Sequence, residues 1–84
     1  MWYIQWEKKA VQQIKKIPKE SRLKIITAIQ SLKQWPDCHN VKALTNYEYG
    51  YRLRVGRYRV FFDVEDTLKI LNIEEVKKRN ERTY

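Results

Sequence analysis

The sequence has few of the residues that crosslink, ligate metals or interrupt regular structure. Its 84 residues include one cysteine, one histidine, two glycines and two prolines. The lone cysteine, Cys38, excludes a disulfide within the chain and suits a reducing compartment, so we expect a cytoplasmic protein. No apolar run approaches the length of a membrane span, and the first residues lack the pattern of a secretory signal. With so few thiols and imidazoles, we predict no metal site.

Positive charge is abundant. Lysine and arginine total 18 against 10 aspartates and glutamates, which gives a formal net charge of +8. A chain of this length makes one small domain, so we treat residues 1–84 as a single unit. The excess charge predicts an acidic partner, which leaves nucleic acid, an acidic protein and an anionic membrane surface as alternatives.

The first half of the chain predicts a short strand and two helices. Residues 2–6 alternate apolar and polar side chains, as a half-buried strand does. Helices are predicted over about 7–17 and from about 18 to 34, with Pro18 between them. Their apolar residues recur at helical spacing, namely Ala10, Val11, Ile14 and Ile17, then Leu23, Ile25, Ile26, Ile29 and Leu32. So short a connection indicates an antiparallel helical hairpin.

A β-hairpin is predicted over residues 51–62, where apolar side chains alternate with arginines. Gly56 and Arg57 form its turn, because glycine at the first central position suits a type II′ loop. A two-residue turn fixes the register, so that one face is apolar and Arg54 lies opposite Arg59. The apolar pairs are Val55 with Tyr58, Leu53 with Val60, and Tyr51 with Phe62.

The flanking segments are less regular. Residues 35–49 read as loops from which Val41, Ala43 and Leu44 reach the core. After a turn at 65–66, a strand over about 67–75 is expected to place Leu71 opposite Val60, Ile73 opposite Tyr58 and Asn72 beside Arg59. The predicted fold is therefore α+β, with an N-terminal strand and an antiparallel helical hairpin packed on a small antiparallel β-sheet.

The arginines of the hairpin indicate an anion site. Like charges directly opposite each other destabilise a sheet, so the pairing of Arg54 with Arg59 has a cost. Arg52 lies two residues along the same face. Guanidinium groups match the geometry of phosphate oxygens. The alternative is a solvated basic face, which a single arginine would favour but three in this register do not.

These residues also carry a resemblance to a known family. The run from Tyr51 to Val60, YRLRVGRYRV, resembles the signature of the RelE/ParE superfamily of bacterial type II toxins. The helical segment 10–18, the SLKQWP at 31–36 and the KAL at 42–44 match its usual layout. The resemblance implies a toxin neutralised by a cognate antitoxin. RelE-like members cut mRNA in the ribosomal A site, whereas ParE-like members inhibit DNA gyrase.

For a RelE-type enzyme, the resemblance implies residue roles and no metal or cofactor. The matching catalytic positions are Arg54, Arg59, Arg79 and Tyr84. Further RNA-binding positions are Arg52, Arg57, Lys77 and Lys78. The arginines would hold the phosphate and its transition state, and the terminal tyrosine would stack on a base. The best-studied RelE pattern has lysines where this chain has Arg52 and Arg54.

A general base is not evident in this set. Arginine keeps its proton, so the remaining candidates are Lys77, Lys78, Glu48 and Glu74. A site without a strong base needs RNA bent for in-line attack, and we therefore hypothesise that cleavage depends on the ribosome. The alternatives are a ParE-like gyrase inhibitor without catalysis and a small RNA-binding domain. We also expect an antitoxin segment with apolar and acidic residues to cover Phe61, Leu68 and Ile70, or the helices.

Overall fold

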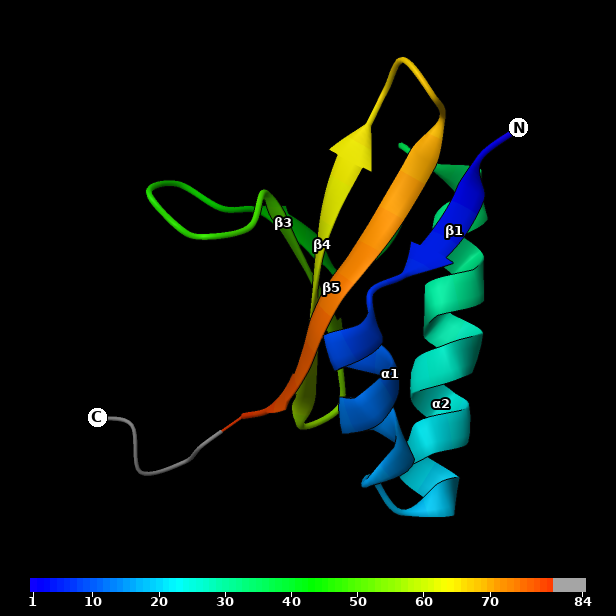
Figure 1. Ribbon diagram of the computed structural model, residues 1–84, viewed down its shortest axis with the longest axis vertical. Coiled ribbons are helices and arrows are strands. Elements are labelled where there is room, and N and C mark those ends of the chain that lie inside the picture. The colour runs from blue at the N-terminus through cyan, green and yellow to red at the C-terminus, as the bar shows by residue number, and fades with distance from the viewer. Residues whose placement is uncertain (80–84) are drawn as a thin grey trace.

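A computed structural model describes residues 1–79 and shows a five-stranded sheet with helices on one face (Figure 1). The strand order is β1-β5-β4-β3-β2, mostly antiparallel, with β1 alone parallel to its neighbour β5. The strands are β1 (Tyr3–Trp6), β2 (Val41–Ala43), β3 (Tyr51–Val55), β4 (Tyr58–Glu65) and β5 (Ile70–Lys78). The helices are α1 (Lys8–Lys15), α2 (Lys19–Gln30) and the 3-10 helix η1 (Ser31–Gln34). The predicted α+β class is confirmed.

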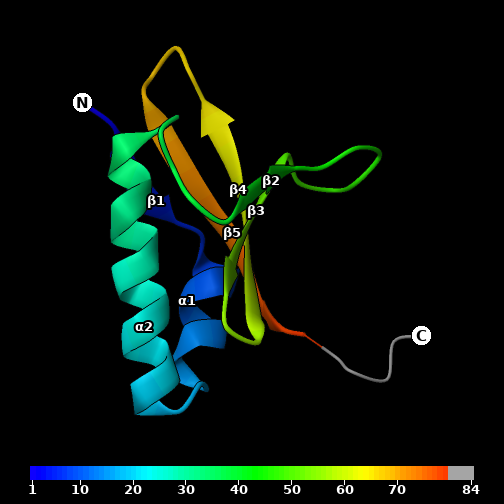
Figure 2. The same ribbon diagram turned by 180° about the vertical axis from the view of Figure 1, so that it is seen from behind.

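The two helices bury the residues that their apolar spacing predicts. Ala10 and Ile14 of α1 and Ile25 and Ile29 of α2 are buried, because they recur on the side of each helix that faces the sheet. Both helices run along the same face of the sheet, as views from opposite sides show (Figures 1 and 2). Leu23 departs from the prediction, because its position on α2 faces solvent and leaves it 53% exposed.

The β3–β4 hairpin has the predicted register. Tyr51 pairs with Phe62, Leu53 with Val60, Arg54 with Arg59 and Val55 with Tyr58. Gly56 has a φ of 57°, a conformation in which a Cβ would be strained. Arg57 is not among the described residues of positive φ, so the turn has the type II′ pattern that the sequence indicates.

The predicted pairing of β4 with β5 is wrong. Residues 66–69 form a four-residue turn that ends in Lys69 at a φ of 58°, so Glu65 pairs with Ile70. A register shift between Phe61 and Phe62 then displaces the pairing once more. As a result, the three residues in question have other partners: Leu71 pairs with Val64, Ile73 with Phe62 and Asn72 with Asp63. The predicted partners on β4 pair further along β5, with Val76 opposite Val60, Lys77 opposite Arg59 and Lys78 opposite Tyr58.

Two edges of the sheet differ from the sequence-based picture. The segment predicted as a loop contains a short strand, β2, that pairs with β3. Within it Val41 packs on the core as predicted, but Ala43 is exposed and does not reach the core. At the other edge β1 pairs only with residues 70–73 of β5. Beyond those residues, α1 packs against β5 in place of β1. There the Gln13 Oε1 accepts the Val76 N–H at 2.7 Å, which satisfies an edge donor.

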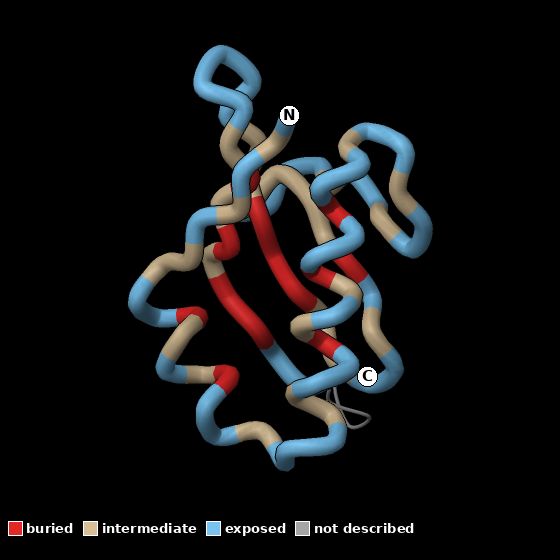
Figure 3. Tube along the Cα trace, turned by 90° about the vertical axis from the view of Figure 1, so that its right-hand side faces the viewer, coloured by how far each residue is buried: buried red, intermediate tan, exposed pale blue. Residues whose placement is uncertain are grey.

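The core lies between the helices and the central strands. Figure 3 shows the buried positions along the middle of the sheet and on the inward sides of the helices. Phe62, Leu53, Val60, Leu71 and Ile73 are at most 2% exposed. The residues Trp2, Ile4 and Trp6 pack against this core from β1 and its start, as their alternation predicts. Within residues 1–79, no helix is long and apolar enough to cross a membrane.

Two leucines three residues apart test the β4–β5 register. Leu71 is fully buried on β5, whereas Leu68 in the preceding turn is 64% exposed. Leu71→Ala should lower the free energy of unfolding by about 2–5 kcal/mol, because it opens a cavity. Leu68→Ala should change it by less than about 0.5 kcal/mol. Urea unfolding of both variants measures the difference, and equal losses would contradict the four-residue turn.

Candidate functional site

The sheet face away from the helices carries a row of cations that crosses three strands. Arg54 of β3, Arg59 of β4 and Lys77 of β5 are successive partners in the ladder. The next row joins Arg52, Phe61 and Glu75. We call the surface formed by Arg52, Arg54, Arg59 and Lys77 the arginine face. The sequence predicted the arginines here, and the corrected β5 register adds Lys77 to them.

The arginines of this face have no counterion among residues 1–79. Within residues 1–79, no carboxylate forms an ion pair with Arg52, Arg54 or Arg59. Burial lowers the pKa of the Arg52 guanidinium, and the nearby charges of Arg59, Arg54 and Arg79 lower it further, although arginine remains protonated. The buried Arg52 Nε has no hydrogen-bond partner among the described residues. Uncompensated cations and an orphan donor together suit a bound anion.

Arg79 reaches this site through a backbone contact. Its N–H donates to the carbonyl of Arg57 in the hairpin turn, so Arg79 lies against the hairpin. That contact brings the predicted tail arginine close enough to influence Arg52 electrostatically. The other predicted tail residue, Tyr84, lies outside the described residues. Its assignment as a base-stacking residue therefore remains a prediction.

Arg57 and Lys78 lie at a different place from the other predicted RNA-binding residues. Both line a hollow of about 390 Å³ between the hairpin turn and the start of α2. Pro18, Ser21 and Lys24 form its helical wall. The structure thus brings Arg52, Arg54, Arg59, Lys77 and Arg79 together and sets Arg57 and Lys78 beside them, around the end of the hairpin.

A buried carboxylate that the sequence did not single out supports one side of the site. Glu75 is 4% exposed on β5. It accepts hydrogen bonds from Gln13 Nε2 at 3.3 Å and from the Tyr49 hydroxyl at 3.1 Å. It also forms ion pairs with Lys9 at 3.3 Å and Lys77 at 3.5 Å.

These partners decide the charge state of Glu75. Burial alone would raise the pKa of its carboxyl, but the hydrogen bonds from Gln13, Tyr49 and Lys9 and the charge of Lys77 bring that pKa below its ordinary value. In the same contact, burial and the neighbouring Glu75 raise the pKa of the Tyr49 hydroxyl, so it stays a donor. Only the β4–β5 register could have revealed Glu75, because its partners come from elements distant in the sequence.

Loop 44–50 places two tyrosines over the neighbouring part of the face. It projects from the sheet away from the helices in both views (Figures 1 and 2). The Gly50 N–H donates to Asp63 Oδ1 at 2.7 Å, which ties the loop to β4. The Tyr47 ring stacks on Phe61 at 5.2 Å between centroids, and Tyr49 packs on the same ring at 5.8 Å. Phe61 is therefore only 4% exposed, covered by the chain itself.

No candidate base lies in the arginine row in a suitable environment. Lys77 and Lys78 are exposed rather than desolvated, and Glu48 is in the exposed part of the loop. Glu74 is held by Asn72 and lies beside Asp63, which is four residues, or about 14 Å, along β4 from Arg59. Burial and the adjacent Asp63 raise the pKa of Glu74. The arrangement is suited to binding and polarising a phosphate, and residues 1–79 supply no proton acceptor at that point.

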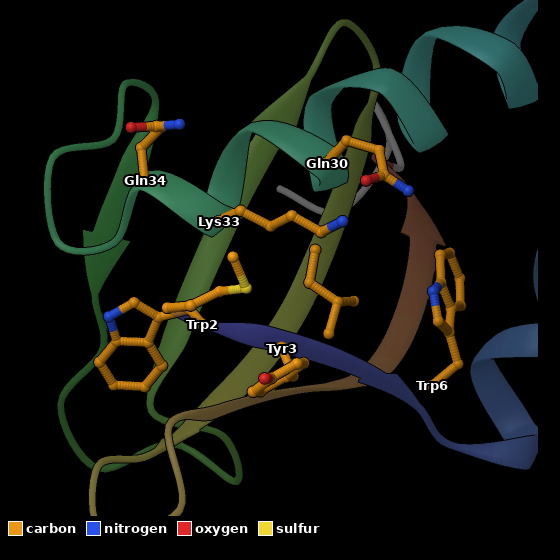
Figure 4. A pocket seen from close by; sticks show the side chains of 8 residues that line it. Trp2, Tyr3, Trp6, Gln30, Lys33 and Gln34 are labelled. Atoms are coloured by element: carbon orange, nitrogen blue, oxygen red, sulfur yellow. The ribbon is translucent and has the colours of Figure 1, made fainter.

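A second hollow, of about 630 Å³, lies away from this face, between β1 and the end of the α2–η1 helix. Figure 4 shows the Trp2 and Trp6 rings at its opposite ends, with Lys33 extending between them. Its lining is aromatic and amide-bearing, with one cation. It holds none of the predicted site residues.

Comparison with protein-family models gives one match over nearly the whole chain. Residues 4–83 match the model of the ParE toxin of the type II toxin–antitoxin system parDE. A comparison with curated protein sequences finds no match.

Solved structures of RelE toxins share the fold. In the archaeal RelE–RelB complex from Pyrococcus horikoshii, a chain 24% identical to this one superposes with a TM-score of 0.79, covering 95% of this chain and 97% of that one. The isolated Escherichia coli RelE toxin gives a TM-score of 0.83 at 14% identity, covering 99% and 89%. The RelB–RelE complex from Methanococcus jannaschii gives 0.71 at 22% identity, covering 88% of each chain.

Two adjacent glutamates with opposite pKa shifts test the electrostatics of the site. The pKa of Glu75 is lowered in the folded protein, so its charge stabilises the fold above the unfolded pKa, and that contribution is lost as the pH falls through the folded pKa. The pKa of Glu74 is raised, so its charge opposes folding at neutral pH. At pH 7, Glu75→Gln should lower the free energy of unfolding, and Glu74→Gln should keep or raise it.

Urea unfolding followed from about pH 7 to about pH 3 measures both effects. Glu75→Gln should flatten the acid-side loss of stability relative to the wild-type protein, whereas Glu74→Gln should steepen it. The same response from both variants would contradict the separate environments described for the two carboxylates.

Proposed function

The chain belongs to the family of ParE toxins of type II toxin–antitoxin systems, and we propose that it acts as a ribosome-dependent endoribonuclease on mRNA. The observation that carries this proposal is the arginine face. Three arginines gather there with no carboxylate paired to them among residues 1–79, and Arg79 lies nearby. Such a cluster suits a phosphate whose negative charge increases during reaction.

The proposed reaction needs no group beyond the RNA itself as nucleophile. The 2′-OH of one nucleotide attacks the adjacent phosphorus, its proton passes to solvent water, and the bond to the 5′-oxygen of the next nucleotide breaks. The products are a 2′,3′-cyclic phosphate and a 5′-OH, which takes up a proton. Arg54 and Arg59 would stabilise the pentacoordinate phosphate, and Arg79 would assist the departing oxygen. Tyr84 is proposed to stack on a base.

Within residues 1–79, the arginine row contains no base in a suitable environment, and this supports dependence on the ribosome. Lys77 and Lys78 are exposed, and Glu75 has its oxygens occupied by Gln13 and Tyr49. Catalysis by such a site relies on alignment and charge stabilisation, because proton removal is unassisted. A ribosome that holds mRNA bent for in-line attack would provide that alignment. We therefore expect slow cleavage of free RNA.

A cognate antitoxin is the proposed protein partner. The structures from Pyrococcus horikoshii and Methanococcus jannaschii are complexes of RelE with RelB. For this chain, an acidic segment would neutralise the arginine face, and apolar side chains would meet the exposed Leu68. If charge reversal at Arg54 and Arg59 leaves antitoxin affinity unchanged, the antitoxin binds elsewhere.

Inhibition of DNA gyrase is the second candidate. It is favoured by the match of residues 4–83 to the ParE toxin model. A gyrase inhibitor would act by binding a protein, so its activity would not require charge stabilisation of a phosphate. The two candidates therefore differ in what they require of Arg59.

Substitution of Arg59 separates them. Arg59→Ala should reduce cleavage of translated mRNA by at least about 100-fold, because it removes a cation from the transition state. The matched control is Arg22→Ala on α2, which lies on the other side of the sheet and should cleave at the wild-type rate. Cleavage in a purified translation system is the readout, with circular dichroism to verify folding.

Either of two results would contradict the nuclease proposal. The first is wild-type cleavage by Arg59→Ala. The second is a wild-type protein that cuts no message but inhibits gyrase supercoiling, which would establish the second candidate instead.

A further inference from the structure

Next to the arginine face, loop 44–50 presents an aromatic ring in a form suited to a planar ligand. Tyr47 is 50% exposed, yet one side of its ring stacks on Phe61 at an interplanar angle of 21°. The ring is thus held parallel to the Phe61 ring on one side, while half of the residue stays exposed. An exposed aromatic ring oriented in this way is the usual platform for a nucleobase.

The platform is held by a series of contacts that runs through β5 to α1. Tyr49 packs beside Tyr47 at 6.3 Å between centroids, and its hydroxyl donates to the buried Glu75. Glu75 is itself held by Gln13 and Lys9 of α1. Because these contacts already hold the loop without a ligand, a base that stacks on Tyr47 would bind with little free-energy cost for ordering the loop.

The position of the platform relates it to the phosphate site. Phe61, which carries Tyr47, is the direct cross-strand partner of Arg52. It also lies two residues along β4 from Arg59, or about 7 Å, on the same face. Lys77 Nζ lies 6.0 Å from the Phe61 ring centre. A base on Tyr47 would therefore belong to a nucleotide next to the phosphate held by the arginines.

We propose that Tyr47, seated on Phe61 and Tyr49, is a stacking site for a nucleobase that flanks the scissile phosphate. This inference rests on the proposed endoribonuclease function and deepens it, because it assigns a second base contact besides the predicted one at Tyr84. RNA is favoured over an antitoxin segment as the occupant because the ring stacks on Phe61, the cross-strand partner of Arg52, so that a base and its adjacent phosphate could be held together. The Tyr47 ring provides binding and orientation, and it takes no part in proton transfer.

The test uses a short single-stranded RNA with a 2′-deoxy nucleotide at the cleavage site and 2-aminopurine next to it. Tyr47→Ala should weaken binding about 10-fold and abolish the quenching of 2-aminopurine, because one base–aromatic stack is lost. Tyr47→Phe keeps the ring and should bind within about twofold of wild type. Tyr3→Ala removes another exposed tyrosine, on β1, and should have no effect.

An RNA that lacks the base expected to stack on Tyr47 provides a further control. If Tyr47 acts by stacking, Tyr47→Ala should cause no further loss when the base opposite it is already missing. Unchanged affinity of Tyr47→Ala for the complete RNA would overturn the inference, as would an equal loss in Tyr47→Phe. So would a Tyr47→Ala variant that loses only antitoxin affinity, since the ring would then be a protein-docking element.

Cleavage of translated message, measured on the same variants, keeps the two proposals separate. A wild-type protein that binds RNA through Tyr47 but does not cleave translated mRNA would refute the nuclease function alone. A wild-type protein that cleaves, while Tyr47→Ala binds and cleaves equally well, would refute the stacking site alone.

Discussion

The pairing of Arg54 with Arg59 across the β3–β4 hairpin is the constraint around which the site is arranged. Two guanidinium groups in directly opposed positions repel, and Lys77 on the next strand adds to the charge. The apolar face of the same hairpin holds the pair in register, because Leu53, Val60 and Phe62 are buried beneath it. A shift of one residue would turn those side chains out of the core. The fold therefore maintains a charge cluster that is unfavourable in the absence of an anion.

The opposite charge nearest to this cluster is not free to cancel it. Glu75 lies in the neighbouring row, but its carboxylate is occupied by Gln13, Tyr49, Lys9 and Lys77. It thus neutralises the edge of the cluster and fixes the tyrosine loop, while the arginines keep their charge. Glu75 and its partners on β5 and α1 thus support the tyrosine loop, whereas the arginines of β3 and β4 form an open cationic surface.

Local patterns in the sequence were enough to predict the hairpin, its turn, both helices and the side of β1 that faces the core. The alternation of residues 51–62 and the glycine at 56 determine the hairpin within a dozen residues. The β4–β5 pairing was mispredicted because it depends on the four-residue turn at 66–69 and on the register shift at Phe61. Both require backbone conformations that the side-chain pattern does not indicate. The role of Glu75 was missed for a related reason. Its partner Gln13 is 62 residues away, and only the tertiary fold brings them together.

Under the proposed function, the arginine face cleaves mRNA only when the ribosome supplies the alignment. The most direct measurement is a primer-extension map of a message incubated with the protein during translation and with translation blocked at initiation. We expect discrete cuts within the translated region that disappear when translation is blocked, with fragments that carry a 5′-OH. Equal cutting in both states, or no cutting in either, would contradict this expectation.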